Sequence, residues 1–281
     1  MAPYSEEPMS DSNPACKDLA EKHTIIRAVV GSTAHGLNLE GTDDRDEMGV
    51  CIEPLEVFGG FHEFEQYIYR TATERTGKHD EPSQHGDLDL TIYSLRKFLR
   101  LALQGNPSIL ILLFVDPLSC VYCNVLGVKL QELAPHIISK QAGKRFLGYM
   151  ESQRQRLLGE RGQKKVNRPE LEEKYGYDTK YAMHILRLGL QGVELMSTGR
   201  ITLPMPERDR GFVRAVRLGQ ISMQDMLTRA GGLEREVKDL LDSGPLPDHP
   251  NENLVEEWMI RTYFEMWKAQ RFMPFLPEHV M

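Results

Sequence analysis

The first 125 residues alternate short apolar runs with polar or glycine-containing breaks. Runs of this length that are rich in β-branched and aromatic residues are typical of strands rather than of helices. The last of them alternates strictly between polar and apolar residues, which is the pattern of a half-buried strand. Four such runs predict strands, at 25–30, 44–52, 64–70 and 87–93.

Between and after these strands the pattern predicts helices. Small residues follow Gly31 and predict a short helix from Ser32, and Ser94 is a plausible N-cap for a helix over 95–104. The compact apolar run at 108–115 fits a strand or a helix equally well. Beyond residue 125 the apolar period becomes helical. Glycines and prolines divide that part into predicted helices at 126–140, 142–160, 178–198, 211–218, 222–242 and 252–271.

A sheet in front and helices behind predict the α+β class, with a small mixed β-sheet and a mostly helical C-terminal region. Residues 1–20 are rich in Ser, Pro, Glu and Asp and are predicted to be a disordered tail. The sheet-containing part is expected to span 21–125 and the helical region 126–281. No long linker separates the two, so one compact unit is as consistent with the pattern as two domains.

Composition narrows the functional class. The net charge of −7 argues against a broadly basic nucleic-acid coat, although a local basic groove is compatible with it. No apolar stretch approaches the roughly 18 to 20 residues that span a bilayer, and the N-terminus lacks the pattern of a secretory signal. We therefore expect a cytoplasmic protein with no membrane partner. The pair Cys120-x-x-Cys123 has no second Cys/His pair at a metal-ligand spacing, so the sequence predicts no zinc site.

Residues 31–46 carry the clearest chemical signal. A strand that ends at Gly31-Ser32 can place the first turn of a helix, and its free N–H groups, close to an anion. In an extended segment, residues two apart face the same way, so Asp44 and Asp46 can present two carboxylates side by side. A solvated turn after Gly41 is the alternative for these acids.

A second acidic strand strengthens the metal interpretation. Asp87 and Asp89 lie on one face of the predicted strand at 87–93, and either can supply a third carboxylate. Two divalent ions held by three carboxylates can activate a hydroxyl and stabilise the leaving oxygen of an in-line phosphoryl displacement. The sequence therefore predicts a metal-dependent phosphoryl or nucleotidyl transfer site.

These motifs resemble the nucleotidyltransferase superfamily typified by DNA polymerase β, in which a Gly-Ser turn is followed about a dozen residues later by Asp-x-Asp and then by a third acid. The chain is most similar to the RNA-ligase-associated nucleotidyltransferases of bacteria and phages. The resemblance covers roughly 25–205. Its later motifs match the stretch from Asp89 to Phe98, the turn Gly105-Asn106-Pro107, and the stretch from Lys180 to Arg187.

The resemblance implies roles for individual residues. Gly31 and Ser32 would hold the triphosphate, and Asp44 and Asp46 would bind metal ions. Asp89 fits the position of the third acid better than Asp87 does. The sequence also departs from the family pattern, because His35 stands where Tyr is expected and Met48 stands where Arg often follows.

A basic stripe in the helical region is a further candidate for nucleotide binding. Lys180, His184 and Arg187 follow one another at i, i+4 and i+7, so they share one face of the predicted helix at 178–198. They can line a cleft against the triphosphate. A solvated face with local ion pairs is the alternative.

Together these features predict an enzyme that uses Mg²⁺, as two ions with Mn²⁺ as a substitute, to transfer NMP from an NTP with release of pyrophosphate. By analogy with the resembling family, the catalytic core would be 21–125, the region 126–281 would complete the cleft, and the acceptor would be an RNA 3′ hydroxyl such as a damaged tRNA end. Two alternatives remain. Transfer to a protein side chain or a small molecule suits the acidic net charge, whereas an inactive nucleotide-binding module is disfavoured by the intact acidic trio. The sequence carries no signal for the preferred NTP or for the oligomeric state.

Overall fold

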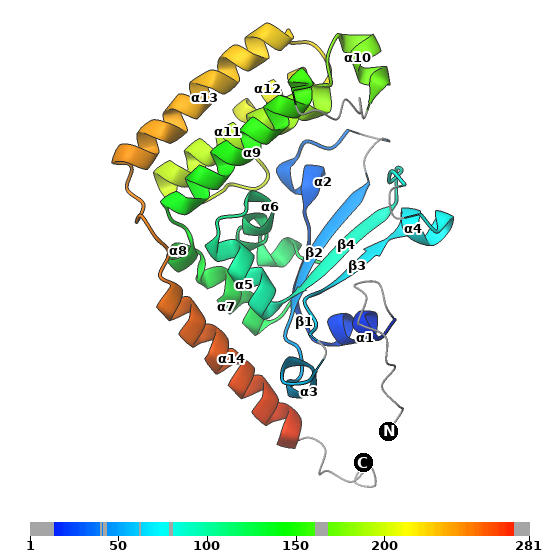
Figure 1. Ribbon diagram of the computed structural model, residues 1–281, viewed down its shortest axis with the longest axis vertical. Helices are drawn as coiled ribbons and strands as arrows, with labels where there is room; N and C mark the ends of the chain where they lie inside the picture. Colours follow the sequence, from blue (N-terminus) through cyan, green and yellow to red (C-terminus); the bar gives the residue numbers. More distant parts are fainter. Residues whose placement is uncertain are drawn as a thin grey trace.

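A five-stranded mixed sheet lies on one side of the molecule, beside the long helices (Figure 1). The computed structural model describes residues 14–39, 41, 44–61, 63–78, 81–160 and 168–272. The strand order is β3-β4-β2-β1-β5, in which β2 and β4 run parallel and the other neighbouring pairs run antiparallel. The four predicted strands are confirmed to within two residues. The strands are β1 (Thr24–Val29), β2 (Arg45–Cys51), β3 (Gln66–Arg70), β4 (Leu88–Ser94) and β5 (Tyr122–Cys123).

Short helices connect these strands. The Ser94 hydroxyl accepts a hydrogen bond from the Lys97 N–H at 3.2 Å, which confirms the predicted N-cap. The open choice for 108–115 is resolved, because helix α6 and the 3₁₀ turn η1 occupy 107–113. The elements are α1 (Pro14–Lys22), α2 (Gly31–His35), α3 (Leu55–Phe58), α4 (Thr71–Thr76), α5 (Leu95–Leu103), α6 (Pro107–Leu110), η1 (Ile111–Leu113) and η2 (Pro117–Ser119).

The remainder of the described chain is helical, as predicted. The predicted helix at 126–140 is divided in two, and the helix predicted at 211–218 begins four residues earlier, at Glu207. A helix at 169–175 was not predicted. These elements are α7 (Val125–Glu132), α8 (Ala134–Ile137), α9 (Lys140–Leu158), α10 (Pro169–Tyr175), α11 (Thr179–Thr198), α12 (Glu207–Arg217), α13 (Met223–Ser243) and α14 (Glu252–Phe272).

The prediction of a disordered tail is wrong for residues 14–20, which belong to α1. Cys16 and Ala20 are 1% and 0% exposed and pack with Tyr67 and Ile92 on one face of the sheet. These two small residues bury an entire helix face without forming a strong apolar pattern in the sequence. Residues 1–13 lie outside the described residues.

The opposite face of the sheet shares one hydrophobic core with the helices. Ala28 of β1 and Met48 and Val50 of β2 belong to the same buried cluster as Phe146 of α9 and Leu186 of α11. Figure 1 shows α9, α11 and α13 packed side by side next to α2, near the end of the sheet where β2 and β4 begin. The structure therefore confirms the α+β class with a helical C-terminal region. The domain boundaries at 20 and 125 stay predictions.

Within the described residues, no helix is both long enough and apolar enough to cross a membrane.

Candidate active site

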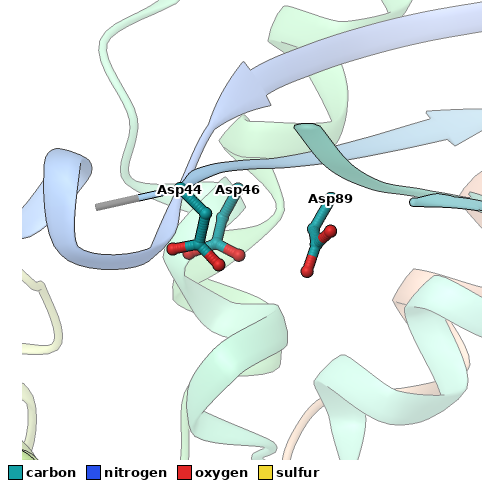
Figure 2. Close-up of side chains that lie close together, drawn as sticks. All are labelled: Asp44, Asp46 and Asp89. Atoms are coloured by element: carbon teal, nitrogen blue, oxygen red, sulfur yellow. The ribbon is translucent and has the colours of Figure 1, made fainter. Parts of the chain in front are cut away.

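Three carboxylates converge where the parallel strands β2 and β4 begin. Asp44 precedes β2, Asp46 lies within it, and Asp89 is the register partner of Asp46 in β4. One oxygen from each residue can be chosen so that all three lie within 4.8 Å of one another. Figure 2 shows the side chains of Asp44 and Asp46 overlapping and that of Asp89 directed to the same side. The parallel pairing thus brings together acids that are 43 residues apart in the chain.

Asp87 does not join this cluster. Its two oxygens accept hydrogen bonds from Arg75 Nη1 at 2.8 Å and Arg75 Nη2 at 3.1 Å, and Oδ2 also accepts the backbone N–H of Gln84 at 2.8 Å. These bonds, chiefly those from Arg75, lower the pKa of Asp87. The carboxylate is 4% exposed and committed to holding α4 against β4. Of the two candidates for a third acid, the geometry therefore favours Asp89.

Gly31 is required by the acidic cluster itself. Its φ of +63° lies in the left-handed region, and a Cβ at this position would lie 2.0 Å from Asp46 Oδ2. The Asp46 carboxylate therefore rests directly against the Gly31 backbone. Next to it, the Val30 N–H donates to the Asp46 carbonyl at 2.9 Å, which fastens the end of β1 to the start of β2.

A pocket opens between this acidic cluster and the helices α11 and α12. Ser32 and Asp44 lie on the sheet side, and Lys180, His184 and Arg187 lie on the helix side, so the predicted stripe does face the predicted metal ligands. The Asp178 carboxylate caps α11 by accepting the N–H groups of Lys180 and Tyr181. The pocket is lined by Gly31, Ser32, His35, Leu37, Asp44, Asp46, Lys180, Met183, His184, Arg187 and Arg217.

Arg187 is a partly buried cation without a carboxylate partner among the described residues. Its Nη1 lies 3.2 Å from His35 Nε2 and donates to Gln191 Oε1 at 3.0 Å, and both of these partners are uncharged. Burial lowers the pKa of Arg187 to about 10, so the guanidinium stays charged at neutral pH. An uncompensated buried charge is costly, and an anionic ligand in the pocket would offset that cost.

The two histidines of the pocket are neutral at pH 7. Burial, followed by the charges of Arg187 and Lys180, lowers the pKa of His184 to about 3. Burial and Arg187 also lower the pKa of His35 well below its usual value. The His35 ring is 4% exposed and lies between Arg187 and Gln191, with its Nδ1 at 3.0 Å from Gln191 Nε2. His35 therefore packs against Arg187 and helps to hold its guanidinium in place.

Sequence reasoning missed Arg217, which lines the same pocket from α12. Its Nη1 donates to Thr179 Oγ1 at 3.1 Å, and this bond ties the end of α12 to the start of α11. The available signal was the spacing of Arg210, Arg214 and Arg217 at i, i+4 and i+7, the same spacing as in the stripe on α11.

Arg70 and Ser83 were also missed. They lie beside Asp89, with the Ser83 hydroxyl 2.8 Å and 2.9 Å from its two oxygens and Arg70 Nε 3.3 Å from its Oδ2. No sequence motif marks them, because their place depends on the register of β3 against β4 and on the segment before β4.

Comparison with known proteins adds the family. No curated protein matches the chain. Among solved structures, a nucleotidyltransferase-like protein from Exiguobacterium sibiricum 255-15 is 12% identical, covers 80% of this chain and 71% of its own, and superposes with a TM-score of 0.29, which is too low to carry an argument. The family model described as "RNA repair pathway DNA polymerase beta family" matches residues 14–229. Since this match spans most of the chain, the protein belongs to that family and is a polymerase-β-like nucleotidyltransferase.

Proposed function

We propose that the protein transfers NMP from an NTP to an RNA 3′ hydroxyl with release of pyrophosphate, in a reaction that depends on Mg²⁺. The observation that carries this proposal is the pocket that places Asp44 and Asp46 opposite Lys180 and Arg187. A metal-bound triphosphate is the ligand whose two kinds of charge match both sides, because its phosphates are anionic and its ions are cationic.

The acidic cluster fits a divalent metal. Three carboxylates with oxygens within 4.8 Å of one another are hard oxygen donors, which suit Mg²⁺ and Mn²⁺ better than softer ions. We assign Asp44, Asp46 and Asp89 as the ligands of two Mg²⁺ ions, with Mn²⁺ as a substitute. Bound ions would supply charge stabilisation to the phosphates and lower the pKa of the attacking hydroxyl.

The chain's own groups would position the nucleotide. Gly31 and Ser32, at the start of α2, line the pocket on the sheet side, where a backbone N–H or the Ser32 hydroxyl can donate to phosphate oxygens. Lys180 and Arg187 supply positive charge from the helix side, and the neutral His184 supplies a hydrogen-bonding ring nitrogen. Asp89 belongs to the acidic cluster but does not line this pocket, so we place the acceptor hydroxyl beside it, with Asp89 as the group that accepts its proton.

The RNA acceptor rests on the family, whose description places it in RNA repair. A damaged tRNA 3′ end is one acceptor of this kind. The net charge of −7 favours a second candidate, transfer to a protein side chain or a small molecule, because a strongly acidic surface repels RNA at long range.

One labelling experiment separates these acceptors. The protein is incubated with each α-labelled NTP, Mg²⁺ or Mn²⁺, and total RNA, total protein or neither. Label in RNA that is lost on 3′-end blocking supports the proposal. Label in protein or in a small product supports the second candidate, and no label under any condition with a folded protein contradicts nucleotidyl transfer. Asp242→Asn, on the exposed face of α13, is the matched control for carboxylate variants.

A further inference from the structure

The third carboxylate of the cluster already has a cationic neighbour. Arg70 is the last residue of β3 and the register partner of Asp89 in β4. Its Nε lies 3.3 Å from Asp89 Oδ2, and the side chains of the pair are 27% and 24% exposed. Both groups are therefore largely removed from bulk water, where charges interact more strongly than they do on an open surface.

Ser83 completes this arrangement. Arg70 Nη2 donates to Ser83 Oγ at 2.9 Å and to the Glu81 carbonyl at 3.1 Å. The Ser83 hydroxyl has one proton, and both Asp89 oxygens lie within 2.9 Å of it. Ser83 thus accepts from Arg70 while it donates to Asp89, and the three side chains form one connected network next to the acidic cluster.

The contact between Arg70 and Asp89 is much looser than that of the neighbouring pair. Arg75 grips Asp87 through two nitrogens at 2.8 Å and 3.1 Å, whereas Arg70 reaches Asp89 through one nitrogen at 3.3 Å. Two-point pairs are the strong ones. The contact between Arg70 and Asp89 is therefore the weaker one, which another cation can replace, while the pair of Arg75 and Asp87 stays intact.

We propose that Arg70 is a positioning residue that competes with the divalent ion for Asp89. Without the ion, the guanidinium offsets the charge of the clustered carboxylates and occupies one oxygen of Asp89. An ion held by the cluster would take Asp89 Oδ2 in place of Arg70 Nε. This inference rests on the proposed metal-dependent function and assigns a role to a residue outside the sequence motifs.

The test measures metal affinity in the absence of nucleotide. Mn²⁺ binding to the full chain is followed by the electron paramagnetic resonance signal of the free ion. Because Arg70→Gln removes a competing charge, we expect it to bind Mn²⁺ about five to ten times more tightly than wild type. Arg70→Lys keeps the charge and should stay within about twofold of wild type. Structural damage to the site would weaken binding rather than tighten it.

Arg45→Gln is the matched control. Arg45 stands between Asp44 and Asp46 in the chain but points to the other face of the sheet, where it pairs with Glu47 at 2.5 Å. It should change Mn²⁺ affinity less than twofold. Equal tightening in Arg45→Gln and Arg70→Gln would mean that any nearby positive charge has the same effect, which would overturn the proposal. Unchanged or weaker Mn²⁺ binding in Arg70→Gln would also overturn it.

A second measurement uses the wild-type protein and does not depend on the folding of Arg70→Gln. In protein labelled with ¹⁵N-arginine, the Nε–H resonance of Arg70, identified by its absence from Arg70→Lys, should shift on addition of diamagnetic Mg²⁺, while that of Arg75 stays in place. An Arg70 resonance that does not shift at saturating Mg²⁺ would overturn this inference but not the proposed function. Failure of the wild type to bind Mn²⁺ or Mg²⁺ at all would instead contradict the proposed function.

Discussion

The sheet and helix α11 treat charge in opposite ways. On the sheet, basic residues pair with an acid, since Arg27 and Arg45 both lie 2.5 Å from Glu47. On α11, Arg187 has only uncharged partners, and no carboxylate lies within ion-pair distance of Lys180 in the described chain. The first pattern is that of a stable fold. The second leaves positive charge available to a ligand, and it faces the carboxylates that are expected to hold the metal.

Removing a carboxylate of the acidic cluster should have the largest effect on activity. Asp44→Asn or Asp89→Asn should lower the rate of label transfer about 100-fold or more, because a metal ligand and a negative charge are lost together. Thermal melts should match wild type, since neither residue is fully buried. Normal transfer by either variant, with Asp242→Asn as the reference, would remove these acids from the chemistry.

Gly31→Ala should disturb the contact between Gly31 and the Asp46 carboxylate. The alanine Cβ would lie 2.0 Å from Asp46 Oδ2, so the carboxylate must move, and alanine would also have to adopt a φ of +63°, which L residues rarely do. We expect transfer to fall about 10-fold or more and stability to fall by about 1 kcal/mol or more. Activity assays and denaturant unfolding measure the two effects. Gly41→Ala, with a similar φ of +76° but open space around its Cβ, is the control that carries backbone strain without the clash.

The basic side should affect nucleotide binding instead of chemistry. Lys180→Ala and Arg217→Ala should each weaken NTP binding by about 1 to 3 kcal/mol, the range for charge-assisted hydrogen bonds. Lys238→Ala on α13 and Arg208→Ala on α12 are exposed controls that remove the same charges elsewhere. Titration calorimetry gives the affinities. Equal losses in variants and controls would mean that only the overall charge matters.

The neutral His184 should affect the pH dependence of stability and leave the chemical step at neutral pH unchanged. The pKa of His184 is about 3 in the fold and near 6.5 when unfolded, so the unfolded chain binds the extra proton between these values. Stability should therefore fall as the pH drops below 6.5, by up to about 1.4 kcal/mol per pH unit for this one group. His184→Gln should flatten the dependence between pH 6.5 and 5. An unchanged slope would mean that His184 is already protonated in the fold.

Local patterns predicted the strands and most helices, because period and caps are written in neighbouring residues. Helix α10 was missed because its seven residues, largely charged and without a buried side chain, carry no apolar period. Helix α1 was taken for a tail because its buried face is made by Cys16 and Ala20, which give little apolar signal. In both cases tertiary context decided the outcome.

The residues of the candidate site also differ in how far the sequence predicted them. Asp44 and Asp46 are readable because their spacing alone puts them on one face, and Asp89 stands out because it opens a motif of the resembling family. Arg217 and Arg70 are brought to the site by helix packing and strand register, so the sequence alone does not place them there. The catalytic and binding roles of all these residues stay predictions.

The central claim is that a metal-bound triphosphate lies between the acidic cluster and the basic residues of α11. NTP affinity measured with and without Mg²⁺ tests this claim most directly. In wild type, Mg²⁺ should tighten NTP binding about 10-fold or more, since an ion held by Asp44 and Asp46 would attract the phosphates. Asp44→Asn should lose that gain, whereas Lys180→Ala should bind more weakly than wild type with or without Mg²⁺. NTP affinity that is indifferent to Mg²⁺ and to Lys180→Ala alike would contradict the account.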